Sequence, residues 1–176
     1  MDNEIIIRDV TVSDAPELLD IYAPYVLNTA VTFEYDVPTA DEFINRIEKI
    51  RRKYPYIAAQ QNGVILGYAY AGAFKERAAY NKSAETTIYV KEDSRRCHIG
   101  SRLYSALEEK LRTQGILNMN ACIAYPETED EYLTFDSFRF HEKMDFDLVG
   151  EFHKCGYKFG RWYNMIWMEK LIGEHL

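Results

Sequence analysis

Cysteine, glycine and proline are all scarce in this sequence. Cys97, Cys122 and Cys155 are an odd number with no Cys-x-x-Cys spacing, which argues against a disulfide framework and against a thiolate zinc site. Glycine and proline number 9 and 5 among 176 residues, so collagenous and low-complexity classes are excluded. We therefore expect a globular chain that carries no metal.

Positive charge and long apolar runs are lacking as well. The 21 Lys and Arg against 28 Asp and Glu give a formal net charge of −7, which argues against nucleic-acid binding because that binding depends on clustered cations. The apolar, uncharged run 64–74 is far shorter than the roughly 20 residues of a membrane-spanning helix. The N-terminus has no basic region followed by a cleavable apolar segment. These absences predict a cytoplasmic protein with neither nucleic acid nor membrane as a partner.

What the sequence does contain is the composition of one globular domain. Hydrophobic residues make up 47% and charged residues 28%, which are ordinary globular values. The length fits a single domain spanning 1–176. Aromatic residues reach 14%, and 14 of them are tyrosines, which favours a sheet-rich core.

Hydrophobic periodicity predicts the element order β-α-α-β-β-β-α-β-α-β-β, a mixed α/β domain with an antiparallel first half. The first helix is expected to begin near Ser13 as N-cap, and the second follows a capping box of Thr39 and Glu42. Asn62-Gly63 predicts a type I′ hairpin. Strands are expected over 4–8, 56–61, 64–73, 83–90, 120–125, 147–153 and 162–169, and the later helices over 99–114 and 135–144.

The segment 89–104 is the most informative part of the chain. A strand ends at Val90, a charged loop follows, and a helix starts near Gly100 with Arg95 and Arg96 just before it. Unpaired amides at a helix N-terminus together with guanidinium groups suit an anion such as a pyrophosphate. An ordinary strand-to-helix loop with surface arginines is the alternative.

This segment resembles the phosphate-binding signature of the GNAT acetyltransferase superfamily. Arg95-x-x-His98-x-Gly100 is similar to Gln/Arg-x-x-Gly-x-Gly/Ala, which cradles the pyrophosphate of acetyl-CoA. Further blocks look like phosphinothricin N-acetyltransferases and the methionine sulfoximine and sulfone acetyltransferases, in family order over nearly the whole chain. These blocks are 33–34, 68–72, 74–80, 85–90, 140–143 and 156–163. The resemblance implies the GNAT fold, a mixed and largely antiparallel central sheet flanked by helices.

Two departures from the family pattern stand out. His98 replaces the first glycine of the signature, so that a side chain lies where the backbone approaches the pyrophosphate. The acidic stretch 127–131 lengthens a loop, and it lacks the ligand spacing of a metal site, so a solvated loop is expected there.

The resemblance also implies roles for individual residues. Glu85 matches the general base that deprotonates the amine, and His141 stands where many GNAT enzymes have a tyrosine that protonates the leaving thiolate. The alternative for Glu85 is a surface ion pair, and the alternative for His141 is a packed, hydrogen-bonded side chain without a catalytic role. The residues expected to bind acetyl-CoA are Ile88, Tyr89, Val90, Arg95, Arg96, Cys97, His98, Ile99, Gly100, Ser101 and Ser137. Those expected to bind the acceptor are Phe33, Glu34, Arg77, Tyr80 and Thr86. The alternative for Phe33 is simple core packing, and the alternative for Arg77 is a solvated loop cation.

The implied function is acetyl transfer from acetyl-CoA to the α-amino group of a small acceptor of the phosphinothricin or methionine sulfoximine type. A GNAT enzyme for a polyamine or a protein N-terminus is one alternative, and a non-catalytic acyl-CoA-binding module is another. The tail 155–168 holds more aromatic side chains than one strand buries, which predicts a homodimer, as in the similar enzymes. The competing explanation is that 127–136 covers these aromatics within one chain.

Overall fold

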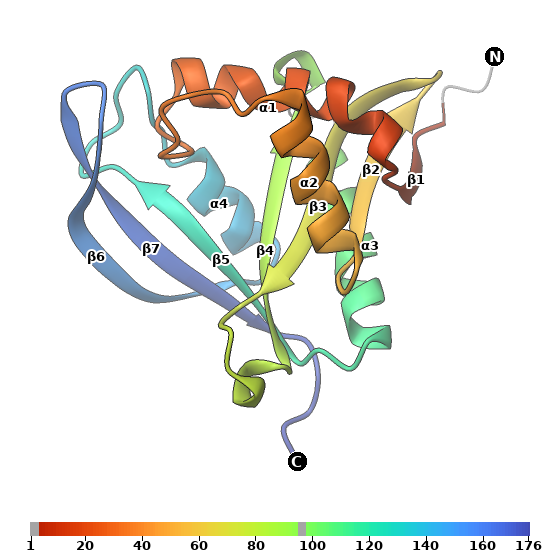
Figure 1. The fold of residues 1–176 in the computed structure, drawn as a ribbon. Helices are drawn as coiled ribbons and strands as arrows, with labels where there is room; N and C mark the ends of the chain where they lie inside the picture. The colour runs from red at the N-terminus through yellow and green to blue at the C-terminus, as the bar shows by residue number, and fades with distance from the viewer. Residues whose placement is uncertain (1–3, 95–97) are drawn as a thin grey trace.

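The computed structural model describes residues 4–94 and 98–176, so Arg95, Arg96 and Cys97 lie outside the described residues. A seven-stranded sheet with the order β1-β2-β3-β4-β5-β7-β6 forms its centre (Figure 1). The β4–β5 pair is parallel, and the other neighbouring strands are antiparallel. The predicted mixed, largely antiparallel sheet is therefore confirmed.

The order of the elements also agrees with the prediction, apart from their ends. The strands are β1 Ile6–Asp9, β2 Tyr56–Gln61, β3 Val64–Ala73, β4 Ser83–Val90, β5 Asn118–Tyr125, β6 Asp147–Lys158 and β7 Arg161–Leu171. The helices are α1 Ala15–Asn28, α2 Ala40–Arg51, α3 Ile99–Thr113 and α4 Asp136–Lys143. In the described part of the chain, no helix has the length and apolar character needed to cross a membrane.

Two local predictions hold and one is wrong. The Thr39–Glu42 capping box is present, and both Asn62 (φ 51°) and Gly63 (φ 84°) have the positive φ of a type I′ turn. Ser13 is not the N-cap of α1. A 3-10 turn precedes that helix, and Asp14 accepts from the Thr11 amide at 2.7 Å, so the capping box lies one turn earlier.

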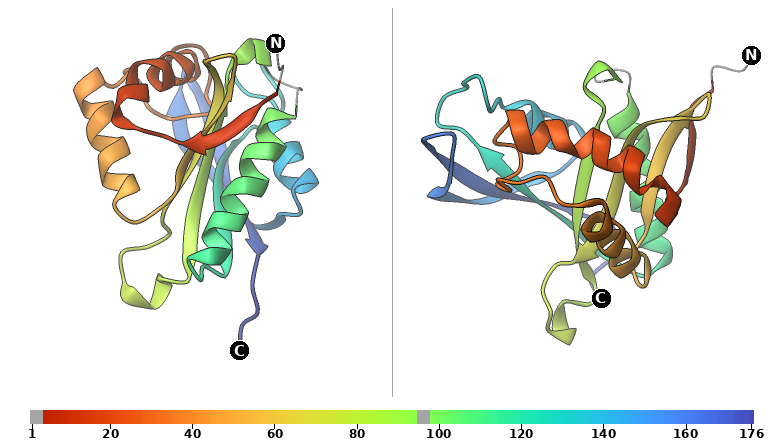
Figure 2. Two further views of the ribbon diagram at one scale, coloured as in Figure 1. Left: turned by 90° about the vertical axis from the view of Figure 1, so that its right-hand side faces the viewer. Right: turned by 45° about the horizontal axis from the view of Figure 1, so that its top comes forward.

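Helices cover both faces of the sheet, and strand alternation decides which side chains meet them. On β2, Tyr56 and Ala58 join the core under α1 and α2, whereas Ile57 and Ala59 join the core under α3. The view along the sheet in Figure 2 (left) shows α2 on one side and α3 on the other. This alternation applies equally to β4, where it separates the candidate site residues.

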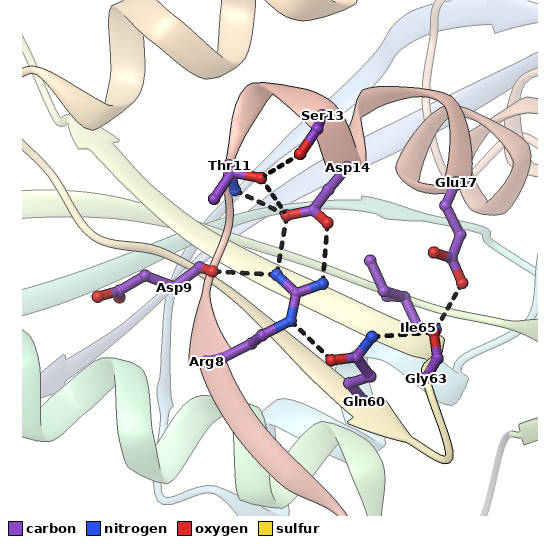
Figure 3. A network of polar contacts seen from close by, with 9 residues as sticks. All are labelled: Arg8, Asp9, Thr11, Ser13, Asp14, Glu17, Gln60, Gly63 and Ile65. Atoms are coloured by element: carbon purple, nitrogen blue, oxygen red, sulfur yellow. Dashed lines mark hydrogen bonds and ion pairs between the residues drawn. The ribbon is translucent and has the colours of Figure 1, made fainter.

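A polar network fastens α1 to the first hairpin of the sheet (Figure 3). Arg8 on β1 forms a bidentate pair with Asp14 at 2.8 Å and also donates to Gln60 at 2.8 Å. Gln60 in turn donates to the Gly63 carbonyl, and Glu17 accepts from the Ile65 amide. These contacts hold the N-terminal end of α1 against the β2–β3 turn.

The parallel strands β4 and β5 separate part of the way along their length. The register joins 83–85 to 118–120, and in the described chain the rest of β4, 86–90, has no paired residue in β5. Figure 1 shows the two strands diverging from the middle of the sheet. The separation opens a cleft between their upper halves.

The β6–β7 hairpin is longer than predicted. The expected loop 156–161 is mostly strand, and only Phe159 (φ 52°) and Gly160 (φ 74°) form the turn between Lys158 and Arg161. The sequence pattern hid this extension because the register shifts twice along β6, which interrupts the alternation of buried and exposed residues.

The acidic stretch after β5 is a loop with Glu127, Thr128, Glu129 and Glu131 exposed, as expected, and its end contacts this hairpin. Asp130 accepts from the amides of Tyr132 and Leu133 and from the Tyr163 hydroxyl, all within 2.9 Å. Arg161 pairs with both Asp130 and Glu131, and the rings of Tyr132 and Phe159 stack at 4.3 Å. The intrachain cover that competed with the dimer prediction therefore exists for part of the tail.

Candidate active site

A cleft lies where β4 and β5 separate. Residues of both strands, of α3 and α4, and of two loops line it. They are Val31, Thr86, Thr87, Ile88, Tyr89, Tyr104, Ala121, Cys122, Ile123, Ala124, Leu133, Ser137 and His141. The cleft thus brings together Ile88, Tyr89 and Ser137 of the predicted acetyl-CoA residues with His141.

Glu85 is the last residue of β4 that pairs with β5, so its backbone lies at the fork between the two strands, next to Thr86 and Thr87, which line the cleft. It is half-buried and, by alternation, faces the α1–α2 side together with Thr87 and Tyr89. Burial raises the pKa of its carboxyl group, and the nearby Lys75 ammonium partly opposes that rise. Such a carboxylate is a stronger base than an exposed one.

The opposite face of β4 carries a closed hydrogen-bond network. Thr86 Oγ1 lies 3.3 Å from the Tyr104 hydroxyl, which lies 2.9 Å from His141 Nε2. His141 Nδ1 lies 2.7 Å from the Ser137 carbonyl. Because a carbonyl only accepts, Nδ1 carries the proton and Nε2 accepts from Tyr104. Thr86 therefore lies on the face opposite Glu85 and not with the other predicted acceptor residues.

His141 does not have the environment of a general acid. It is 3% exposed, and burial lowers the pKa of its imidazole to about 4. At neutral pH the ring is uncharged, and its one N–H proton is donated to the Ser137 carbonyl. The geometry favours the alternative of a packed, hydrogen-bonded histidine that orients Tyr104 at the cleft.

His98 is the N-cap of α3, and its backbone has the left-handed conformation with φ 59°. Glycine adopts this conformation without a steric penalty, which explains why the family signature has glycine here. Gly100 is needed for packing, since a Cβ there would lie 2.9 Å from the Phe140 ring of α4. Ile99 is buried in the core, and Ser101 donates to the His98 carbonyl at 3.0 Å.

The upper end of β4 presents backbone groups to the cleft. The Val90 amide and carbonyl both contact the Tyr25 hydroxyl, at 3.3 and 2.6 Å. The Ala84 carbonyl accepts from the Asn120 side chain of β5 at 3.2 Å. Because every second residue of a strand points its amide to the same side, the Ile88 amide also faces the β5 side, into the cleft.

Phe33 and Glu34, the predicted opposite wall, already have partners. The Phe33 ring packs on Tyr163 with centroids 6.5 Å apart, and it lies directly over Gly156. Glu34 accepts from the Tyr22 hydroxyl at 2.8 Å and pairs with Arg46 at 2.8 Å. Packing is therefore at least part of what Phe33 does.

The loop after β3 carries the candidate groups for an acidic acceptor. Arg77 is exposed, and its carbonyl accepts from the Tyr80 amide at 2.9 Å, while the Tyr80 ring contacts Phe74. Lys75 Nζ lies over the rings of Phe74 and Trp167, 4.9 and 5.1 Å from their centroids. Sequence reasoning missed Lys75, although it lies in the block 74–80, two residues before Arg77.

Sequence reasoning also missed Tyr104 and Cys122. Tyr104 is one of several core-spaced residues of α3, and only its contact with His141 sets it apart. Burial raises the pKa of the Cys122 thiol to about 11, helped by Glu85, so this thiol is protonated at neutral pH. Within the described residues, no group of three or more His, Cys, Asp or Glu could hold a metal ion.

A mixed sheet whose one parallel pair separates around a cleft is the frame of this site, and comparison with known proteins gives its family. A family model described as an acetyltransferase (GNAT) domain matches residues 7–167. The chain therefore belongs to the GNAT acetyltransferase family, and it is an acetyl-CoA-dependent acetyltransferase.

Three relatives with about a third of their residues identical are named as acetyltransferases. Phosphinothricin N-acetyltransferase of Streptomyces viridochromogenes is 33% identical, covering 90% of this chain and 83% of its own. L-methionine sulfoximine/L-methionine sulfone acetyltransferase of Pseudomonas paraeruginosa is also 33% identical, covering 93% and 92%. The crystal structure of a phosphinothricin acetyltransferase from Sinorhizobium meliloti in complex with acetyl-CoA superimposes with a TM-score of 0.87 at 32% identity, covering 96% of this chain and 89% of that one.

Proposed function

We propose that the enzyme acetylates the α-amino group of a small amino-acid-like acceptor of the phosphinothricin, methionine sulfoximine or methionine sulfone type. The observation that carries this proposal is half-buried Glu85, with a carboxyl group of raised pKa, at the fork between β4 and β5. The names of the relatives support the acceptor class. A carboxylate there can take the proton that an ammonium must lose before its nitrogen attacks a thioester.

The cleft fits the thioester end of acetyl-CoA. Its walls are mostly apolar, and the amides of β4 that face it, with Ile88 foremost, can stabilise negative charge developing on the thioester oxygen. Tyr89, Val90 and Ser137 would contact the cofactor chain, and the α3 N-terminus from His98 to Ser101 would face its phosphates. The same role for Arg95, Arg96 and Cys97 stays a prediction, because these residues lie outside the described chain.

We assign the transfer to direct attack by the amine. Glu85 takes one proton from the ammonium, and the free amine then forms its bond to the acetyl carbon. The carbon–sulfur bond breaks as CoA leaves as its thiolate, which takes up the second proton that the nitrogen loses. Cys122, the thiol closest to this chemistry in the described residues, stays protonated and so is a poor nucleophile. Lys75 and Arg77 would hold the acidic end of the acceptor, with Phe33, Glu34 and Tyr80 around it. His141 and Thr86 act through Tyr104 as positioning residues.

The test is thiol release from acetyl-CoA with three groups of amines. We expect turnover with phosphinothricin, methionine sulfoximine or methionine sulfone, and little with polyamines or with peptides that have a free N-terminus. Turnover with peptides alone would favour the protein N-terminus alternative. Binding of acetyl-CoA without release of thiol for any amine would favour a non-catalytic module.

We also infer a homodimer through the β6–β7 hairpin. Phe152 and Trp162 of this hairpin remain 57% and 60% exposed, and Leu148, Val149 and Tyr157 are exposed as well. Large apolar side chains left exposed in such number often mark an interface. Lys158 of this hairpin is buried in its own chain, so it does not reach a neighbouring acceptor site. Light scattering that gives the monomer mass of 20.6 kDa at micromolar concentration would overturn the dimer.

A further inference from the structure

Lys158, at the end of β6 beside the hairpin turn, is a buried cation that the proposed chemistry does not use. It is 2% exposed, and its Nζ donates hydrogen bonds of 2.8 Å to the carbonyls of Val26, Thr29 and Thr32. An ammonium has three protons, so the main chain uses all of them. Val26 and Thr29 lie at the C-terminal end of α1, where the helix dipole favours a positive charge.

The three carbonyls belong to the end of α1 and to residues 29–35 of the α1–α2 loop. Other contacts also tie this part of the loop to the hairpin. The Ala30 amide donates to the Tyr132 carbonyl at 3.0 Å, and the Tyr35 hydroxyl donates to the Tyr157 carbonyl. Figure 1 shows this loop, the acidic loop after β5 and the β6–β7 turn gathered at one end of the molecule. Lys158 is the buried polar group at their junction.

The α1–α2 loop forms part of the wall of the reaction cleft. Val31 and Leu133 line the cleft from the two loops, and they pack in one cluster with Ala30 and Tyr163. Lys158 holds the carbonyls of Thr29 and Thr32, which flank Val31 on either side. The position of this wall therefore depends on an ammonium supplied by β6, more than a hundred residues later in the chain.

We propose that Lys158 is a positioning residue for acetyl transfer. Its ammonium fixes the loop around Val31, so that the cleft holds thioester and amine in a reactive arrangement. The proposal rests on the proposed function in one respect only, that the cleft contains the reacting groups. A displacement of about 1 Å in such an arrangement can lower a rate about 10²-fold.

The first test is Lys158→Met, which keeps the length of the side chain and removes its donors. We expect kcat to fall about 10- to 10²-fold, as misplacement of reacting groups does, with little change in the KM for acetyl-CoA. Hydrogen exchange should quicken in 29–35 and stay unchanged in β2 and β3. Lys154→Met is the matched control. Lys154 belongs to the same strand, and its Nζ lies 3.8 Å from a carboxylate oxygen of the exposed Glu127. We expect Lys154→Met to change neither kcat nor the exchange in 29–35.

A milder variant covers the case in which Lys158→Met does not fold. Tyr35 is 63% exposed, so Tyr35→Phe should fold while it removes one tie between the loop and the hairpin. It should quicken exchange in 29–35 and lower kcat by less than Lys158→Met. Unchanged exchange in that loop for the folded variants would overturn the proposal, as would faster exchange with an unchanged kcat. If no amine is acetylated by the wild type, the proposed function fails, while exchange still reports on the loop.

Discussion

The two faces of β4 differ, because one carries the general base that we propose and the other carries a closed hydrogen-bond network. On one face Glu85 is half-buried, and its carboxyl group has a raised pKa because burial disfavours its charge. On the other, Thr86, Tyr104 and His141 are almost wholly buried and satisfy one another by hydrogen bonds. Burial therefore destabilises the charged form of Glu85, the proposed general base, whereas hydrogen bonds stabilise Thr86, Tyr104 and His141. Substitutions on the two faces should therefore differ in whether they change rate or stability.

The largest effect should come from Glu85→Gln. We expect kcat at pH 7 to fall roughly 10²- to 10⁴-fold, which is what a general base typically contributes. The acid limb of the wild-type rate profile, which should lie above the pH of an ordinary carboxyl because the pKa is raised, should vanish. Steady-state kinetics across pH would check both, with the exposed Glu76→Gln as a control that keeps wild-type activity. Near-wild-type turnover by Glu85→Gln would remove Glu85 from the mechanism.

The same variant should not lose stability. A carboxyl group whose pKa is raised in the folded state binds a proton more readily there than in the unfolded chain. Its contribution to stability is therefore lost as the pH rises above the ordinary glutamate pKa. Urea unfolding at pH 7 should find Glu85→Gln at least as stable as the wild type, and a marked loss of stability would mean that the carboxylate is structural.

The second effect is the pH dependence that His141 gives to stability. Its folded pKa of about 4 lies below the ordinary 6.5, so the unfolded chain binds more protons between these values. Stability should rise with pH across this window, by about 3 kcal/mol at 1.36 kcal/mol for each pKa unit. Comparison with His141→Gln isolates the contribution, since this variant should lack it. Parallel pH profiles for the two proteins would contradict a buried neutral imidazole.

A smaller effect is expected for Tyr104→Phe. The variant keeps the ring but removes the hydroxyl that donates to His141 Nε2, leaving a buried acceptor unpaired. That loss should cost about 1–3 kcal/mol of the unfolding free energy. We expect kcat to fall by less than in Glu85→Gln, because Tyr104 lines the cleft without taking the amine proton. A loss of rate as large as that of Glu85→Gln, with unchanged stability, would place the chemistry on this face instead.

The smallest effect should come from His98→Gly, at the start of the helix that covers the Thr86 face. Relief of the left-handed conformation, worth about 1–2 kcal/mol, is largely offset by the greater freedom of an unfolded glycine. We expect a gain in stability below about 1 kcal/mol and acetyl-CoA binding that is unchanged or tighter by calorimetry. His98→Ala keeps the Cβ and should show no gain in stability. Much weaker binding by His98→Gly would mean that the imidazole contacts the cofactor.

Local patterns were sufficient for most of the secondary structure. The Asn62-Gly63 turn and the Thr39–Glu42 capping box depend on residues within four positions of each other, and both are present. The pattern failed at the C-terminal hairpin, where bulges interrupt the alternation. It placed 127–131 in an exposed loop but could not show that Asp130 contacts Arg161 and Tyr163, some thirty residues away.

For the site, the sequence by itself determined the family and placed Glu85 on the strand that precedes the predicted phosphate loop. These features follow from spacing along one strand and from motifs whose residues are close in sequence. Only the tertiary structure decided that His141 is buried and neutral, that Lys75 lies over Phe74 and Trp167, and that Lys158 supports the α1–α2 loop. Burial and partners come from elements far apart in the chain, and they determine protonation state and orientation, so they could not be predicted from the order of the residues alone.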